Sequence, residues 1–317
     1  LIYPDFNLWD FALKPSALQT QQNVNISGGT EDVKYFVSLG HLFQDGLFKN
    51  FKQKYDWNYT YHRYNYRANV DINVTKTTKL GLNIGGRSEI RNKPNEQVAD
   101  QPLRYFFAQP PFTTAGIVDG KRIVTATKYY PISGIPADGL ATLFGRGYIT
   151  DTKNVLNLDI MVNQKLDFIT KGLEFRSKVS YNSIYNHNKN RSTSNSYYEA
   201  WYKADVDAAA VGDSSIVLRK FGTDGILSYS ESFGKDRDWY LEGGFSYSRS
   251  FGPHNVTGLL LYNQSKAYYP AVYPGIPLGY VGLVGRATYD YRTKYLLEFN
   301  LGYNGSENFA PGKRFGL

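Results

Sequence analysis

The sequence lacks most of the residue patterns on which catalysis and metal binding depend. It contains no cysteine, which excludes disulfides, cysteine-ligated metals and thiol nucleophiles. Its histidines are far apart in the sequence, and none has a partner at the i,i+4 spacing of a helical metal pair: His41, His62, His187 and His254. No nucleophile elbow or phosphate-binding loop occurs. We therefore predict that the protein is not an enzyme and uses no cofactor.

Long apolar runs are also absent, since no stretch approaches the roughly 18 apolar residues of a transmembrane helix. Aromatic residues, by contrast, make up 16% of the chain, with 28 tyrosines, and 30 residues are glycine. This composition favours strands over helices. A mean hydropathy of −0.44 is compatible with a membrane β-barrel, because only alternate residues of each barrel strand face lipid. The net charge of +8 is scattered without any long basic run, so nucleic acid is not expected as a partner.

A strict period of two residues is clearest at 64–74 (YNYRANVDINV). Eleven alternating residues are about the length that a tilted barrel strand needs to cross a bilayer, whereas a soluble sandwich strand usually ends after about five or six. One face of the segment is apolar, and the other carries Asn65, Arg67, Asn69, Asp71 and Asn73. We expect these polar side chains to face the lumen of a barrel. A lining with both signs of charge suits neutral glycans or peptides, but the side chains could also form a solvated inner wall without contact to a solute, and for any individual residue we favour the solvated wall.

The same alternation recurs along the chain and predicts ten strands, at 20–28, 32–43, 59–74, 79–90, 153–165, 172–183, 237–251, 254–265, 279–291 and 294–304. The connections between these strands are short and long in turn. The long ones cover about 44–58, 91–152, 184–236 and 266–278. Short turns at one end and long loops at the other are typical of an outer-membrane barrel. The sequence therefore predicts an all-β, antiparallel, up-and-down transmembrane β-barrel, with short periplasmic turns and long extracellular loops.

The long loops are expected to contain structure of their own. A weak helical pattern at 96–108 predicts a short helix, and Asp224-Gly225 predicts the turn of an extra hairpin over 216–234. Three aspartates resemble a calcium site weakly, without the glycine and bidentate glutamate of a calcium loop, so a solvated loop is favoured: Asp205, Asp207 and Asp213.

Loop aromatics are the other candidates for contact with a solute. They could stack on sugar rings, contact a lid, or pack the loops against each other. They are Tyr129, Tyr130, Tyr197, Tyr198, Trp201, Tyr202, Tyr268 and Tyr269. We expect at least half of them to serve packing.

Three long stretches resemble the SusC/RagA family of TonB-dependent transporters, and the resemblance covers nearly the whole chain. They are NVNISGGTEDVKYFVSLGHLFQDGLFKN (23–50), LRKFGTDGILSYSESFGKDRDWYLEGGFSYSRSFGPHNVTGLLLYNQS (218–265) and GYVGLVGRATYDYRTKYLLEFNLGYNGSENFAPGKRFG (279–316). The resemblance implies a 22-stranded outer-membrane barrel with an amino-terminal plug. It also implies import of glycans or peptides with energy from TonB, and a SusD-like surface lipoprotein as a lid.

The first of these stretches resembles the opening barrel strands of the family. We therefore expect residues 1–317 to be a partial barrel domain, with the plug, its TonB-contacting region and the closing strands outside the chain. The expected location is the outer membrane of a Gram-negative bacterium, with several spans in contact with lipid. Three alternatives share part of the pattern: a passive porin without a plug, an enzyme embedded in a barrel, and a soluble β-rich binding module. The last would have to explain the eleven-residue strand and the one-sided long loops.

Overall fold

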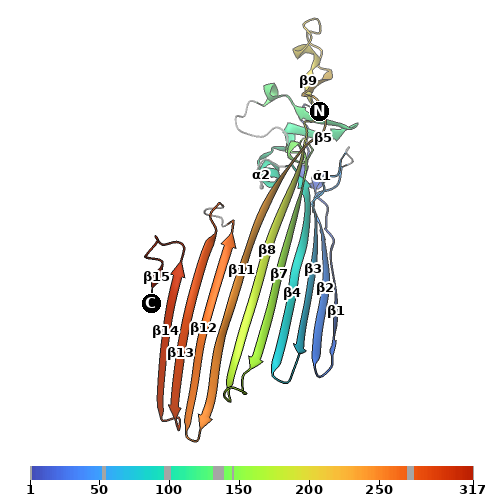
Figure 1. The fold of residues 1–317 in the computed structure, drawn as a ribbon. Helices are drawn as coiled ribbons and strands as arrows, with labels where there is room; N and C mark the ends of the chain where they lie inside the picture. The colour runs from blue at the N-terminus through green and yellow to red at the C-terminus, as the bar shows by residue number, and fades with distance from the viewer. Residues whose placement is uncertain are drawn as a thin grey trace.

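One long antiparallel sheet dominates the computed structural model, which describes residues 2–51, 55–95, 101–130, 139–144, 146–269 and 275–316 (Figure 1). Its eleven strands follow the order β1-β2-β3-β4-β7-β8-β11-β12-β13-β14-β15. Their bounds are β1 Gln19–Gly29, β2 Val33–Asp45, β3 Thr60–Asn73, β4 Thr78–Pro94, β7 Gly147–Lys165, β8 Leu173–Ser192, β11 Ser228–Phe251, β12 His254–Tyr268, β13 Leu278–Tyr291, β14 Tyr295–Ser306 and β15 Phe315–Gly316. We call β1–β4, β7, β8 and β11–β14 together the wall.

The register of the wall sorts its side chains onto two faces. Because successive side chains of a strand point to opposite faces, residues paired across neighbouring strands share a face. The apolar face carries Val24, Leu39, Val70, Leu82, Ile160, Val179, Leu241, Leu260, Leu283 and Leu301. The polar face carries Asn25, Ser38, Asn69, Asn83, Asp159, Ser180, Glu242, Asn263 and Asn304.

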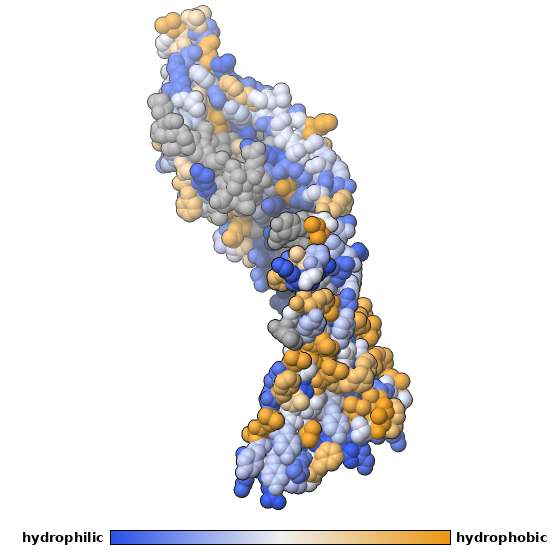
Figure 2. Space-filling view, turned by 60° about the vertical axis from the view of Figure 1, so that its left-hand side comes forward, coloured by the Kyte–Doolittle hydropathy of each residue, from blue (hydrophilic) through white to orange (hydrophobic). Residues whose placement is uncertain are grey.

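No other element of the described chain covers the apolar face. Large apolar side chains on it remain open, among them Val24, which is 61% exposed, and Leu297, which is 68% exposed. In Figure 2, hydrophobic residues gather in a band over the lower half of the molecule, and hydrophilic residues predominate above this band and at the lowest tip. This surface needs an apolar solvent, which a lipid bilayer supplies. Among the described residues, no helix combines the length and apolarity needed to cross a membrane.

Three strands of the wall are much longer than a bilayer requires. β11 has 24 residues, β8 has 20 and β7 has 19. At about 3.3 Å per residue, β11 measures roughly 80 Å, and even at a tilt of about 40° it exceeds the roughly 30 Å hydrocarbon layer about twofold. The outer parts of β7, β8 and β11 therefore stand outside the membrane.

A second body of structure sits on these long strands, at the end of the wall opposite the short turns (Figure 1). We call it the crown: the described residues of 2–18, 46–59, 95–146 and 193–227. It holds a four-stranded sheet in the order β10-β9-β6-β5. Its elements are α1 Leu8–Ala12, α2 Gln101–Ala108, η1 Pro111–Thr113, β5 Thr114–Val118, β6 Lys121–Thr125, η2 Thr127–Tyr129, α3 Ala141–Phe144, β9 Tyr197–Tyr202, η3 Lys203–Asp205 and β10 Ile216–Phe221.

The buried hydrophobic side chains of the described chain lie in the crown. One cluster contains Leu8, Ala12, Trp57, Phe106, Leu140 and Leu143, and a second contains Ile2, Ile123 and Ala200. Both clusters include residues from the amino-terminal segment, which therefore helps to hold the crown together. Burial of these apolar groups, rather than strand pairing alone, stabilises this region.

The structure confirms all ten strands expected from the alternation and corrects their outer ends. β7 begins at Gly147, β8 runs to Ser192 and β11 begins at Ser228, each about six to nine residues beyond the expected limit. The short helix expected within 96–108 is α2, while residues 96–100 lie outside the described residues.

The extra hairpin expected over 216–234 is wrong. Residues 216–221 form β10, which pairs with β9, whereas residues from Ser228 onward continue β11 and pair with β8. The first half of the segment thus belongs to the four-stranded sheet and the second half to the wall, so the two halves do not pair with each other. Asp224 and Gly225 lie in the connection between the sheets instead of in a tight turn.

Candidate transport surface

The five polar side chains expected to line a lumen lie together on the polar face. Asn65, Arg67, Asn69, Asp71 and Asn73 alternate with apolar residues along β3. Through the register, Asn69 is opposite Asn83 of β4, and Asn65 is opposite Arg87. A hollow of about 390 Å³ is lined in part by Asn65, Arg67, Arg87 and Asn157. These neighbours make a surface rich in amides and guanidinium groups.

Charges on the polar face are paired across strands. Lys178 Nζ lies 3.5 Å from Asp159 Oδ1. Asn182 Nδ2 donates to Asp238 Oδ2 at 2.8 Å, and Asn188 Nδ2 donates to Asp151 Oδ1 at 2.6 Å. Because these three carboxylates have donors on the next strand, this part of the face presents hydrogen-bonding groups without a strong field of one sign. Such a surface can bind solutes that carry many neutral hydroxyl or amide groups.

In the crown, Tyr129 is a packing residue at the meeting point of η2, β9 and η3. Its ring lies 5.9 Å from that of Trp201 and 5.4 Å from that of Tyr202. Its hydroxyl donates to Asp205 Oδ2 at 2.6 Å and accepts from the Tyr202 N–H at 2.9 Å. Burial, followed by the hydrogen bond to Asp205, raises the pKa of Tyr129. The ammonium of Lys128, which hydrogen-bonds to Asp205, lowers the pKa of that carboxyl.

The remaining expected aromatics are engaged in ring and cation contacts. Tyr130 is only 5% exposed. The Lys121 ammonium lies 5.3 Å from the ring centroid of Tyr198, and the Arg219 guanidinium lies 5.4 Å from that of Trp201. Tyr197 stacks on Phe221 at 5.8 Å.

Tyr268 and Tyr269 lie at the outer end of β12, beneath cations of β11. Arg237 is 4.5 Å from the ring centroid of Tyr268, and Lys235 is 4.6 Å from that of Tyr269. These contacts assign packing roles to the aromatics of the loops. Whether any of them also touches a solute or a lid stays a prediction.

The three loop aspartates have separate partners. Asp205 is bound by Lys128 and Tyr129, Asp213 by Lys203 and Ser215, and Asp207 accepts from the Ala209 N–H at 3.0 Å. Within the part of the chain that the structure describes, no group of three or more histidines, aspartates or glutamates could hold a metal ion.

Strand pairing brings together two histidines that lie far apart in the sequence. His41 Nε2 lies 3.4 Å from His62 Nδ1, and the rings stack with Tyr64 on the apolar face. The register of β2 against β3, which places His41 opposite Tyr64 and His62 opposite Phe43, produces this contact. Only a register prediction for that hairpin could have found it.

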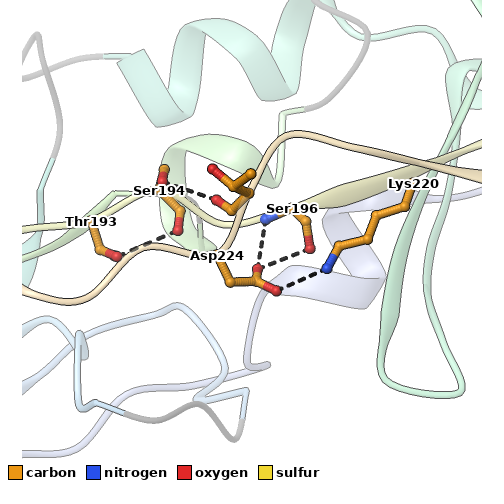
Figure 3. Close-up of polar contacts among 6 residues, drawn as sticks. Thr193, Ser194, Ser196, Lys220 and Asp224 are labelled. Atoms are coloured by element: carbon orange, nitrogen blue, oxygen red, sulfur yellow. Dashed lines mark hydrogen bonds and ion pairs between the residues drawn. The ribbon is translucent and has the colours of Figure 1, made fainter.

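Two chain segments at the base of the crown, which we call the stem, connect β9 and β10 of its sheet to β8 and β11 of the wall, and Figure 3 shows the polar contacts between them. The first segment is 193–196 and the second is 222–227. Asp224 Oδ1 accepts from the backbone N–H and the hydroxyl of Ser196, at 2.8 and 2.9 Å, and Asp224 Oδ2 pairs with Lys220 Nζ at 3.2 Å. The Ser196 backbone N–H is the largest of these influences, and together they lower the pKa of Asp224 to about 2. The sequence pattern named Asp224 only as part of a turn, because its contact with Ser196 spans 28 residues and leaves no local signal.

Comparison with known proteins shows similarity in sequence to a TonB-dependent receptor and in fold to a solved importer. No protein-family model matches the chain. TonB-dependent receptor P3 of Formosa agariphila is 26% identical over 336 residues, a match that covers 97% of this chain and 30% of that protein. The structure of the RagAB peptide importer in its open-open state covers 100% of this chain and 35% of that one, with a TM-score of 0.65 at 13% identity. The closed-closed state gives a TM-score of 0.63 at 12% identity.

The resemblance to SusC/RagA-type TonB-dependent transporters is confirmed. The chain spans about a third of the length of the relatives that it matches. It is a segment of an antiparallel outer-membrane β-barrel, with short periplasmic turns and long extracellular loops. The apolar face of the wall is accordingly the surface that contacts membrane lipid.

Proposed function

We propose that this segment forms part of the wall and the extracellular crown of an active importer that takes up glycans or peptides with energy from TonB. The observation that carries this proposal is the combination of a continuous polar face on the wall with similarity to a TonB-dependent receptor along nearly the whole chain. On this proposal the polar face lines the barrel, and Asn65, Arg67, Asn69, Asp71 and Asn73 contribute to that lining. TonB would act through a plug region that is not among these residues.

The chemistry of the polar face supports glycans and peptides alike. Amide side chains donate and accept hydrogen bonds at once, so they match sugar hydroxyls and peptide groups equally well. Carboxylates that are held by a lysine or an amide of the next strand leave no strong field of one sign, which disfavours a solute with a high net charge. We further propose that a SusD-like surface lipoprotein covers the crown, whose aromatic residues lie at the outer end of the barrel.

Uptake by the full-length protein in the outer membrane of a Gram-negative host tests this proposal. We expect growth on one class of oligosaccharide or oligopeptide that requires both the protein and TonB. Uptake that is equal with and without TonB would instead support a passive porin. Growth on defined oligosaccharides against defined peptides separates the two substrate classes.

A pair of variants on β3 tests the role of the polar face. Asn69→Leu removes an amide from that face and should reduce uptake several-fold, because a hydrogen-bonding group is replaced by an apolar one. Val70→Leu, one residue along on the apolar face, is the matched control and should leave uptake unchanged. Equal uptake by both variants would contradict a solute pathway along this part of the wall.

A further inference from the structure

A group of three cations lies on the lipid side of the wall, at the outer ends of β11 and β12. Arg237 pairs with Tyr268, and Trp239 pairs with Lys266, so all four side chains share the apolar face. Lys235, two residues from Arg237 on the same strand, points to that face as well. We call Lys235, Arg237 and Lys266 the cation group.

Aromatic rings hold the cation group in place. The Arg237 guanidinium lies 4.5 Å from the ring centroid of Tyr268, and the Lys266 ammonium lies 5.7 Å from the same centroid. The Lys235 ammonium lies 4.6 Å from the ring centroid of Tyr269. Rings orient cations at their faces without neutralising them, so the three positive charges remain available to an anion.

Two of the three carboxylates near the cation group lie on the opposite face of the wall, and the third, Glu307, lies beside Lys266. Asp236 and Asp238 alternate with these cations along β11 and therefore lie on the polar face, where Asp238 accepts from Asn182 at 2.8 Å. Glu307 is the carboxylate beside Lys266, and the two line the same hollow without forming an ion pair. Across the described ranges, none of the ion pairs within 4.0 Å includes a member of the cation group.

The height of the cation group above the periplasmic turns matches the outer surface of the membrane. β11 ends at Phe251, and the residues on its apolar face up to Trp239 are largely aromatic or aliphatic. At about 3.3 Å per residue and a tilt of about 40°, Arg237 lies roughly 35 Å above Phe251, beyond a hydrocarbon layer of about 30 Å. The cations thus follow directly on the apolar band, at the level of lipid headgroups.

We propose that the cation group binds the phosphorylated headgroup of a lipid in the outer leaflet. Arginine offers a planar fork of donors to phosphate oxygens, and two lysines add mobile point charges. The apolar side chains directly below, including Trp239 and Tyr262, would pack against the acyl chains of the same lipid. A free phosphate ion would contact only the cation group, whereas a lipid would contact the cation group with its headgroup and the apolar side chains with its acyl chains. This inference concerns the outside of the barrel and does not depend on the proposed transport activity.

Lipid retention by the full-length protein tests the proposal. The protein is extracted from the outer membrane in detergent, stripped of lipid and reloaded with lipid A, which carries two phosphates, or with its dephosphorylated form. Bound lipid per protein is then measured by native mass spectrometry. We expect the wild type to prefer lipid A, and the triple variant Lys235→Gln, Arg237→Gln, Lys266→Gln to bind about tenfold less of it.

A control variant on the polar face tests whether loss of a positive charge at this height is enough to reduce lipid binding. Lys153→Gln removes one positive charge at a similar height, but Lys153 lies on the polar face, paired with Asn186. It should bind lipid A as the wild type does. Equal retention of lipid A by the triple variant, or equal binding of the dephosphorylated lipid, would overturn the proposal. Loss of bound lipid A on addition of millimolar inorganic phosphate alone would also overturn it, in favour of a free-phosphate site.

Discussion

The wall and the crown differ in where their large apolar side chains lie. In the wall, large apolar side chains are left open, such as Leu301 at 46% exposure, while in the crown Trp57 and Leu140 are fully buried. The wall is stabilised by strand pairing, and its apolar face is covered by lipid. The crown stands in water and must build its own core. The exposed fraction of an apolar side chain therefore indicates its contribution to stability only in the crown, which water surrounds. In the wall, lipid covers the same kind of side chain.

The difference extends to sequence pattern. A wall strand alternates because its two faces meet different surroundings, and this period persists from β1 to β14. The crown packs helices, short strands and an amino-terminal segment around two small clusters, so its apolar residues follow no single period. The effect of a substitution on stability should therefore depend on contact with water in the crown and on contact with lipid in the wall.

The largest effect is expected for truncation of the crown core. Trp57→Ala should destabilise the crown by about 3–5 kcal/mol, because a large side chain with 0% exposure is removed from the first cluster. Limited proteolysis of the full-length protein should then cut the crown while the wall stays resistant. Ile226→Ala, at a side chain that is 92% exposed, is the matched control and should leave the protease resistance of both the crown and the wall unchanged. Simultaneous loss of wall resistance would contradict the separation of the two regions.

A charge on the lipid side of the wall should have the next largest effect. Ile160→Arg places a guanidinium on the apolar face in the membrane-spanning part of β7, at an expected cost of about 2–4 kcal/mol. Asn157→Arg, on the polar face of the same strand, should cost much less. The measurement is the free energy of unfolding in lipid vesicles. Similar costs for both variants would show that the apolar face is not in contact with lipid.

Much of the wall could be predicted from the sequence because the two faces of each strand meet different surroundings. Alternation at 64–74 identified β3, its faces and the side chains that share them, since a barrel strand cannot slip by one residue without exposing polar groups to lipid. The outer ends of β8 and β11 escaped prediction. Beyond the membrane both faces meet water, so residues such as Asn186, Asn188 and Asn190 no longer alternate with apolar partners.

The crown was predictable only in fragments. The helical pattern before Ala108 identified α2, but β5, β6 and β9 carry no alternation that distinguishes them from loop. β9 pairs in parallel with β6 across more than 70 residues of intervening sequence, and such long-range pairing leaves no local signal. The same limit explains why the aromatic candidates could be named but their contacts could not. Tyr129 owes its role to Asp205 and Tyr202, which come from a different loop.

The smallest expected effect lies in the stem that joins the two regions. Asp224→Ala removes the acceptor shared by the Ser196 N–H and hydroxyl and should ease local opening of the stem by about 1 kcal/mol, a modest value because the carboxylate is exposed. Hydrogen exchange at the Ser196 and Gly225 amides measures this opening. Asp207→Ala is the matched control, since that carboxylate accepts from Ala209 within its own loop. It should leave exchange in the stem unchanged.

Hydrogen exchange of the stem amides should also depend on pH, whereas that of the wall amides provides the reference. The pKa of Asp224 falls from 3.8 to about 2 in the folded protein, so the ionised carboxylate stabilises the stem. That contribution is complete above about pH 4 and is lost as the pH falls toward 2. Wild-type stem amides should therefore exchange faster, relative to those of the wall, as the pH is lowered through this range. Asp224→Ala should show no such change, and a pH response that persists in that variant would assign the coupling between crown and wall to other groups.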